Sequence, residues 1–173
     1  MSARDLVELA ERRYDEYVEA YAEMVNIDSG SFLPEGTTRM ADLCEKRFRS
    51  GGWEVDRIAH TPAEGQAQLG DMVIGQLPGT GEGPAILMIG HTDTVFPDGT
   101  AKERPFTIDE NNFAHGPGVS DMKGGLLGGF FAVEILQEAG LTLGPITGRL
   151  IADMMIGTTP VMDPAPFSAK RFG

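Results

Sequence analysis

Apolar residues recur at three- and four-residue steps along the first fifty residues and predict two amphipathic helices. The first helix is expected over residues 2–26, opening with a capping-box pattern, and the second over residues 38–50, ended by two glycines. Segments 28–31 and 34–36 between them are rich in Gly, Ser and Pro and are expected to form a loop.

Shorter segments further along the chain predict strands. Residues 53–61 and 71–77 are expected to be strands. Residues 85–89 form a continuous apolar run, which is typical of a strand that is buried on both faces. The turn-rich residues 78–84 predict that strands 71–77 and 85–89 pair antiparallel.

The second half of the chain alternates between the two kinds of element. A small hairpin is expected within residues 106–113, a helix that is apolar on nearly every face over 122–139, and a last buried strand over 147–153. This alternation predicts an α/β fold, with a mixed β-sheet and helices packed on its faces. Residues 157–173 contain three prolines and no periodicity, so an irregular tail is expected there.

Charge and cysteine content indicate which binding partners and which cell compartment are expected. The 173-residue chain carries a formal net charge of −12, which disfavours nucleic acid and membranes as partners. The lone cysteine, Cys44, cannot form an internal disulfide, which favours a reducing compartment. Residues 1–13 lack the apolar core of a signal peptide, and the apolar segment 124–136 is too short to span a bilayer. We therefore expect a cytoplasmic protein.

Candidate chemistry follows the apolar run of residues 85–89. His91 and Asp93 come next, and a spacing of two puts their side chains on the same side of an extended chain. Asp121 stands after a glycine-rich turn, at the start of the predicted helix. Imidazole and carboxylate are both good zinc ligands, and Asp93 is placed to accept the second N–H of the His91 imidazole.

These residues allow two other interpretations. A phosphate site is not favoured, because Lys123 is followed by glycine where a P-loop needs Ser or Thr, and because Gly116-x-Gly118 leads to Asp121, whose carboxylate would repel phosphate. An ordinary α/β domain in which His91 and Asp121 are only structural remains open.

Two segments together resemble a known family. Gly90-His91-Thr92-Asp93-Thr94-Val95 and Gly116-Pro117-Gly118-Val119-Ser120-Asp121-Met122-Lys123-Gly124-Gly125 resemble the M20 zinc metallopeptidases, especially glutamate carboxypeptidases, with acetylornithine deacetylase and desuccinylases as relatives. Residues 1–156 are then expected to be a partial catalytic domain and residues 157–173 a tail without resemblance. The implied activity is zinc-dependent hydrolysis of amide or peptide bonds, of carboxypeptidase or deacylase type, on a small peptide or N-acyl amino acid.

The resemblance also implies roles for individual residues. His91 would bind one of two zinc ions, Asp121 would bridge both, and Asp93 would orient His91. A cis peptide bond is implied between Asp121 and Met122. In such enzymes a glutamate deprotonates a metal-bound water, which then attacks the carbonyl group of the substrate.

The sequence departs from the family where its general base and another zinc ligand, both glutamates, should follow. Met154 and Met155 occupy these positions, and a thioether neither accepts a proton nor suits zinc beside hard ligands. His115 is a candidate replacement ligand. With only His91 and Asp121 matched, we expect weak zinc retention and low or no activity, from truncation, frame slip or degeneration. The alternative is a non-catalytic remnant that acts as a binding or self-association module, with homo-oligomers as one outcome.

Overall fold

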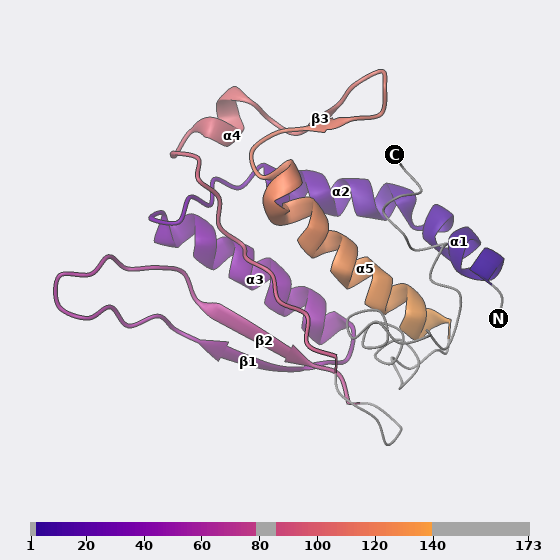
Figure 1. Cartoon of the computed structure of the whole chain (residues 1–173), viewed down its shortest axis with the longest axis horizontal. Helices are drawn as coiled ribbons and strands as arrows, with labels where there is room; N and C mark the ends of the chain where they lie inside the picture. Colours follow the sequence, from indigo (N-terminus) through magenta and orange to yellow (C-terminus); the bar gives the residue numbers. More distant parts are fainter. Residues whose placement is uncertain (1–2, 79–85, 140–173) are drawn as a thin grey trace, which may run out of the picture.

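The computed structural model of the chain describes residues 3–78 and 86–139, and Figure 1 shows their arrangement. Three long helices lie side by side, and a two-stranded sheet lies along one of them. The elements in chain order are α1 (Ala3–Arg12), α2 (Tyr14–Val25), α3 (Pro34–Ser50), β1 (Glu54–Ile58), β2 (Met72–Gln76), α4 (Thr100–Glu103), β3 (Thr107–Ile108), β4 (Ala114–His115), the turn η1 (Val119–Lys123) and α5 (Gly124–Glu138).

The first predicted helix is two helices, α1 and α2, which are separated at Arg13. The prediction of one continuous helix is therefore wrong. The Arg13 amide donates to the carbonyl three residues back, on Ala10, at 3.1 Å, which tightens the last turn of α1. The Arg13 guanidinium is fixed by Glu16 at 2.8 Å and by Glu134 of α5 at 2.7 Å. The break therefore coincides with a contact to a distant helix.

Helix α3 begins at Pro34, so the predicted loop over residues 34–36 is wrong. Proline suits the first helical position, because its φ is already helical and its missing N–H would have no partner there. Gly36 packs directly on the preceding loop, where a Cβ would lie 1.7 Å from the Asp28 carbonyl oxygen. Cys44 is buried on this helix, as part of the core.

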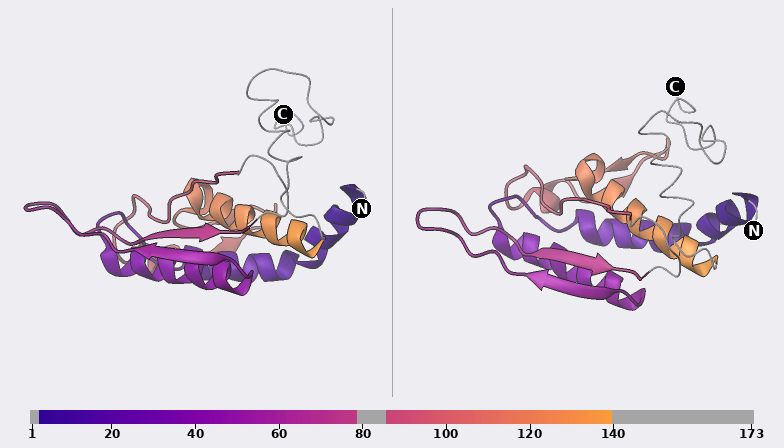
Figure 2. Two further views of the ribbon diagram at one scale, coloured as in Figure 1. Left: turned by 90° about the horizontal axis from the view of Figure 1, so that it is seen from below. Right: turned by 60° about the horizontal axis from the view of Figure 1, so that its bottom comes forward.

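The strands β1 and β2 confirm the predictions for residues 53–61 and 71–77. They pair antiparallel, with Glu54 opposite Gln76 and Ile58 opposite Met72. This hairpin lies along α3, and its long connecting loop projects beyond the helices (Figure 2). Among the described residues β2 pairs with β1 alone, so the predicted pairing of β2 with residues 85–89 is wrong.

Residues 86–90 form no strand, which corrects the prediction of a buried one. Leu87 and Ile89 are 81% and 83% exposed. One side of the segment rests on α5, where a Cβ on Gly129 would lie 2.9 Å from the terminal methyl of Met88. A strand that is buried on both faces needs a second cover and neighbours on its edges, and the described part of the chain supplies neither. The predicted strand over 147–153 lies outside the described residues.

The core lies between α2, α3 and α5. Its buried members are Tyr21, Met24, Val25, Ile27, Met40, Cys44, Leu127, Phe130 and Phe131. Helix α5 confirms the predicted helix over residues 122–139, although it begins only after η1. Its apolar residues face α2 and α3 on one side and residues 86–90 on the other, which accounts for its nearly uniform apolar character.

The predicted hairpin around residues 106–113 is also confirmed, since β3 and β4 pair antiparallel with Thr107 opposite His115. An isolated parallel bridge joins Gly30 to Thr94. The predicted α/β class is confirmed, and the strands of the described part form two small antiparallel sheets. No helix within residues 3–78 and 86–139 has the length and apolarity needed to cross a membrane. The predicted tail over 157–173 lies outside the described residues.

Candidate metal centre

The imidazole of His91 lies between two carboxylates. Its Nε2 is 2.9 Å from Oδ1 of Asp121, and its Nδ1 is 3.1 Å from Oδ1 of Asp93 and 3.0 Å from the Asp93 backbone oxygen. The structure therefore brings together the three residues that the sequence analysis selected. Nδ1 of His91 faces Asp93, the residue expected to orient the ring, and Nε2 faces Asp121, the residue expected to share a metal with it. Their roles as metal ligands are part of the proposal below.

The surroundings of His91 favour its charged form in this arrangement. Partial burial lowers the pKa of His91, but the hydrogen bond to Asp121 and the contacts with Asp93 outweigh that effect and hold the pKa above its ordinary value of 6.5. The side chain of His91 is 45% exposed and that of Asp121 is 85% exposed. Solvent and a small ligand can therefore reach both groups.

A tight turn presents Asp121. Gly118 has a φ of +81°, and a Cβ there would lie 2.7 Å from the Thr94 methyl carbon, so this position requires glycine. The Lys123 amide donates to the Gly118 carbonyl at 2.9 Å and closes the turn. The Asp121–Met122 peptide bond is cis, as the resemblance implied.

Contacts with α2 and with the residues just after it fix this turn, and the sequence pattern did not predict them. Lys123 is 1% exposed, and its ammonium donates to the carbonyls of Met24 at 3.0 Å and Ile27 at 2.7 Å. Burial lowers the pKa of Lys123 to about 8. In the other direction, the Tyr21 hydroxyl donates to the Val119 carbonyl at 2.6 Å. These contacts join residues about a hundred positions apart, and no local sequence pattern indicates them.

His115 has a different partner from the one considered for it. Its Nε2 lies 2.9 Å from Oδ2 of Asp109, in the turn between β3 and β4. A role as replacement ligand beside His91 therefore gains no support from this structure. Met154 and Met155, at the positions expected for the general base and another ligand, lie outside the described residues.

The donor atoms present would suit a zinc ion. Zinc binds imidazole nitrogen and carboxylate oxygen at about 2.0–2.2 Å, so two donors 2.9 Å apart can share one ion. Asp93 would not be a third ligand of an ion bound at His91 Nε2, because its carboxylate lies at the opposite ring nitrogen, Nδ1. Within residues 3–78 and 86–139 no three His, Cys, Asp or Glu side chains gather as a ligand set. The described residues would thus offer such an ion two donors, His91 Nε2 and Asp121 Oδ1.

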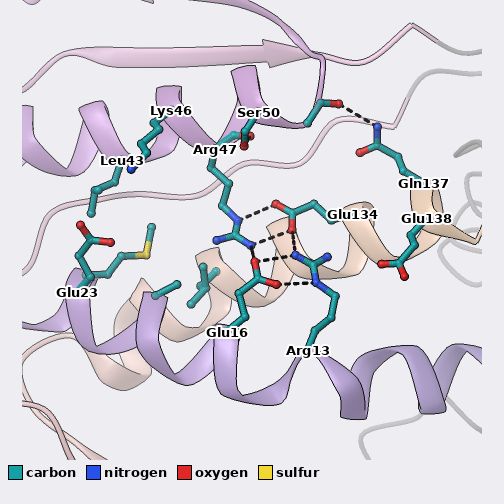
Figure 3. Close-up of a pocket in the computed structure, with 14 residues that line it drawn as sticks. Arg13, Glu16, Glu23, Leu43, Lys46, Arg47, Ser50, Glu134, Gln137 and Glu138 are labelled. Atoms are coloured by element: carbon teal, nitrogen blue, oxygen red, sulfur yellow. Dashed lines mark hydrogen bonds and ion pairs between the residues drawn. The ribbon is translucent and has the colours of Figure 1, made fainter.

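A sizeable cavity of the described part lies elsewhere. It has a volume of about 620 Å³ and is lined mainly by α2, α3 and α5 (Figure 3). Its central charges are already paired, because Glu134 accepts hydrogen bonds from Arg13 at 2.7 Å and from Arg47 at 2.7 and 2.8 Å. Both guanidiniums also lie over the Phe131 ring. We interpret this cluster as a packing network and not as the reactive site.

Comparison with known proteins identifies relatives of the chain. Residues 87–151 match the family described as Peptidase family M20/M25/M40. Carboxypeptidase G2 of Pseudomonas sp. (strain RS-16) is 30% identical over 124 residues, which are 72% of this chain and 28% of that protein. Cys-Gly metallodipeptidase dug1 of Schizosaccharomyces pombe is 29% identical over 152 residues, which are 82% of this chain and 32% of that protein.

A shorter match and a solved structure agree with this assignment. Succinyl-diaminopimelate desuccinylase 2 of Alteromonas mediterranea is 37% identical over 90 residues, 47% of this chain and 24% of that protein. The crystal structure of human carnosine dipeptidase 1 shares the fold, with a TM-score of 0.66 and 20% identity over 81% of this chain and 32% of that one. The chain spans less than a third of the length of these relatives. The resemblance carried by residues 90–95 and 116–125 is confirmed, and the chain belongs to peptidase family M20/M25/M40.

Proposed function

We propose that this chain carries part of the metal centre of a zinc-dependent hydrolase that cleaves amide or peptide bonds. His91 and Asp121 would be protein ligands, and Asp93 would orient His91. The convergence of His91 Nε2 and Asp121 Oδ1 at 2.9 Å, with Asp93 on the other ring nitrogen, is the observation that supports this proposal most. The named activities of the relatives, a carboxypeptidase, a dipeptidase and a desuccinylase, support small peptides or N-acyl amino acids as substrates.

Each residue would contribute in a way that follows from its contacts. A zinc ion, when bound, supplies Lewis-acid polarisation of a carbonyl group, and the family resemblance suggests two ions. Asp93, on the Nδ1 side, keeps the Nε2 lone pair of His91 directed toward Asp121. The exposed carboxylate of Asp121 supplies negative charge beside it.

We also propose that the 173-residue chain by itself binds zinc weakly and has low or no activity. Two ligands from the described residues fall short of the three that catalytic zinc sites usually have. Met154 stands where the family resemblance places the general base, and its thioether cannot accept a proton. The further ligands of such a site would come from a part of the protein that the chain's relatives have and this chain does not match.

The test uses the purified chain with added zinc. Zinc uptake is followed by competition with a chromophoric chelator, and hydrolysis of N-acetylglutamate and of a dipeptide is followed by amine release. We expect weak, saturable uptake that His91→Ala removes, and hydrolysis no faster than that of Asp121→Asn. Turnover of about 1 s⁻¹ or more, as is common for enzymes, would contradict the proposed inactivity. Absence of saturable uptake would contradict the metal site.

A second candidate function is a binding or self-association module. Leu87 and Ile89 of the segment beside α5, together with Val95, which is 90% exposed, present apolar side chains to solvent. Exposed apolar side chains that gather in one patch are common at contacts between proteins, and residues 87–89 are consecutive in the chain. Sedimentation that shows dimers or larger species would support this candidate. A compact monomer that does not bind an apolar dye would argue against it.

A cytoplasmic location completes the proposal. The lone Cys44 supports it, and the net charge of −12 argues against nucleic acid and membrane partners. Cell fractionation with an antibody against the chain tests the location. Recovery in the membrane or secreted fraction would contradict it.

A further inference from the structure

The loop between α2 and α3 reaches the candidate metal centre through one side chain, Ser31. The Ser31 hydroxyl donates a short hydrogen bond to Oδ2 of Asp93. The other carboxylate oxygen of Asp93, Oδ1, lies 3.1 Å from Nδ1 of His91. The Asp93 carboxylate is therefore held between a hydroxyl on one side and the imidazole on the other.

The backbone around Ser31 is fixed with respect to Asp93. The Ser31 amide donates to the Thr94 carbonyl at 3.0 Å, and the Thr94 amide donates to the Ser29 carbonyl at 2.7 Å, which makes a short parallel bridge centred on Gly30. A Cβ on Gly30 would lie 2.5 Å from the Phe96 carbonyl oxygen, so the two segments approach as closely as glycine allows. The backbone position from which the Ser31 hydroxyl extends is therefore fixed.

The loop is anchored again on its other side. The Asp28 carboxylate accepts the backbone N–H groups of Gly99 at 3.0 Å and Ala101 at 2.8 Å, at the start of α4. The buried Ser29 hydroxyl donates to the Thr92 carbonyl at 3.0 Å. Residues 28–31 are therefore hydrogen-bonded to the chain before Asp93 and after it. These contacts fix the loop that connects α2 to α3.

We propose that Ser31 is a positioning residue that acts on His91 through Asp93. Its hydroxyl fixes the rotation of the Asp93 carboxylate so that Oδ1 faces His91 Nδ1. This leaves His91 Nε2 directed at Asp121. The consequence for metal binding rests on the proposed function, whereas the effect on the His91–Asp93 contact does not.

A competing interpretation is that the Ser31 hydroxyl only caps the backbone. The hydroxyl also lies 3.4 Å from the Thr94 carbonyl oxygen, but that distance is beyond the usual range of an O–H···O hydrogen bond. The terminal torsion of aspartate is broad, and the Asp93 side chain is partly exposed. Without the hydroxyl, the carboxylate can rotate toward water. The Asp93 backbone oxygen at 3.0 Å would still accept from Nδ1, so the loss is partial.

The first experiment uses the metal-free protein and does not depend on zinc. Nuclear magnetic resonance of protein with ¹⁵N-labelled histidine follows the exchange of the His91 Nδ1–H proton with water, at a pH where the imidazole is charged. We expect Ser31→Ala to speed this exchange about three- to tenfold and Ser31→Thr, which keeps a hydroxyl, to restore it. Ser50→Ala is the matched control, since the Ser50 hydroxyl donates only to the Arg47 carbonyl at the end of α3. Unchanged exchange in Ser31→Ala would overturn the proposal.

The second experiment separates positioning from general loss of stability. Zinc affinity of Ser31→Ala is expected to fall about three- to tenfold, which is less than the roughly 10–100-fold loss for groups that directly orient a ligand, because Ser31 acts through Asp93. In an Asp93→Ala background, Ser31→Ala should have no further effect on zinc affinity, because the residue through which it acts is absent. An equal loss in both backgrounds would overturn the proposal. If the unmodified chain takes up no zinc, the proposed function fails, and the proton exchange alone decides the role of Ser31.

Discussion

His91 Nε2 and Asp121 Oδ1 lie 2.9 Å apart although the two residues are 30 positions apart in the chain. Neither side chain belongs to the core, since both are largely exposed. Hydrogen bonds elsewhere fix the backbone that carries them. Thr94 pairs with the loop after α2 and holds the segment of His91, and the buried Lys123 holds the turn of Asp121. We infer that the fold positions His91 and Asp121 next to each other and does not depend on their contact for its stability.

This separation predicts the result of replacing either residue. His91→Ala and Asp121→Asn should change the free energy of unfolding by no more than about 0.5 kcal/mol, as for most surface substitutions. Zinc uptake should be lost in both variants. Denaturant unfolding and chelator competition measure the two effects. A loss of several kcal/mol of stability in His91→Ala would assign the residue to the structure and not to a site.

The raised pKa of His91 predicts how the stability of the metal-free protein depends on pH. Because the pKa is higher in the folded state than 6.5, the imidazolium stabilises the folded protein fully below pH 6.5, and this contribution is lost as the pH rises through the raised pKa. The difference in unfolding free energy between the unmodified chain and His91→Ala should therefore shrink from pH 5.5 to pH 8.5.

Zinc should show the opposite dependence, because it needs the neutral imidazole. Its apparent affinity should fall as the pH drops through the same pKa. The double variant Asp93→Asn, Asp121→Asn removes the two carboxylates that raise the pKa of His91. A pH dependence of stability that persists unchanged in that variant would assign the effect to another group.

Lys123 is expected to matter for stability far more than its position in a glycine-rich turn suggests. Lys123→Met leaves the carbonyls of Met24 and Ile27 without their donor in a buried place, at a cost of about 2–4 kcal/mol. Lys102→Met on the exposed surface of α4 is the matched control and should cost less than about 0.5 kcal/mol. Equal small losses in both variants would contradict the anchoring role of Lys123.

The sequence was sufficient for features that depend on near neighbours. The periodic pattern of residues 38–50 predicted α3, and the turn residues 109–112 located the small hairpin of β3 and β4. The turn-rich residues 78–84 led to a wrong pairing, because β2 pairs with β1. The spacing of His91, Asp93 and the glycine-rich turn before Asp121 predicted that these groups converge. The helix, the small hairpin and the relation of His91 to Asp93 depend on signals within a few residues, where local geometry and chain direction decide the outcome. The convergence with Asp121, 30 positions away, was predicted from the two motifs together and their family resemblance, and not from local geometry alone.

Features that depend on distant partners were not predicted. The break at Arg13 accompanies a contact with Glu134, 121 positions away, and the role of Ser31 depends on Asp93, 62 positions away. The apolar run at residues 85–89 predicted a buried strand, and that prediction was wrong. It could not show that Leu87 and Ile89 would be exposed over the described part of the chain, because burial depends on what covers a segment.

The Arg13–Glu134–Arg47 cluster provides a test of the packing interpretation of the cavity between α2, α3 and α5. Glu134→Gln leaves the two partly buried guanidiniums with the half-exposed Glu16 as their remaining shared carboxylate, which should lower the free energy of unfolding by about 2–3 kcal/mol. Glu8→Gln breaks a comparable but exposed pair with Arg4 and should cost about 0.5 kcal/mol or less. Similar small losses in both variants would show that the cluster contributes little to stability.

Cys44 provides a test of how tightly α3 packs on α2 and α5. Its thiol is buried in the core, and burial raises its pKa to about 11. Since the thiolate is the reactive form, native protein at pH 8 should not react with a disulfide reagent until it opens, whereas denaturant-unfolded protein should react at once.

The same shift in the pKa of Cys44 sets a dependence of stability on pH. Between pH 9 and pH 11 the unfolded thiol loses its proton and the folded one keeps it, so the free energy of unfolding should fall as the pH rises, by up to about 2–3 kcal/mol. Cys44→Ala creates a small cavity whose cost does not depend on pH, so its stability should lack this fall. Rapid labelling of the native chain at pH 8, or an identical pH dependence in both proteins, would mean that the thiol is not enclosed by the three helices.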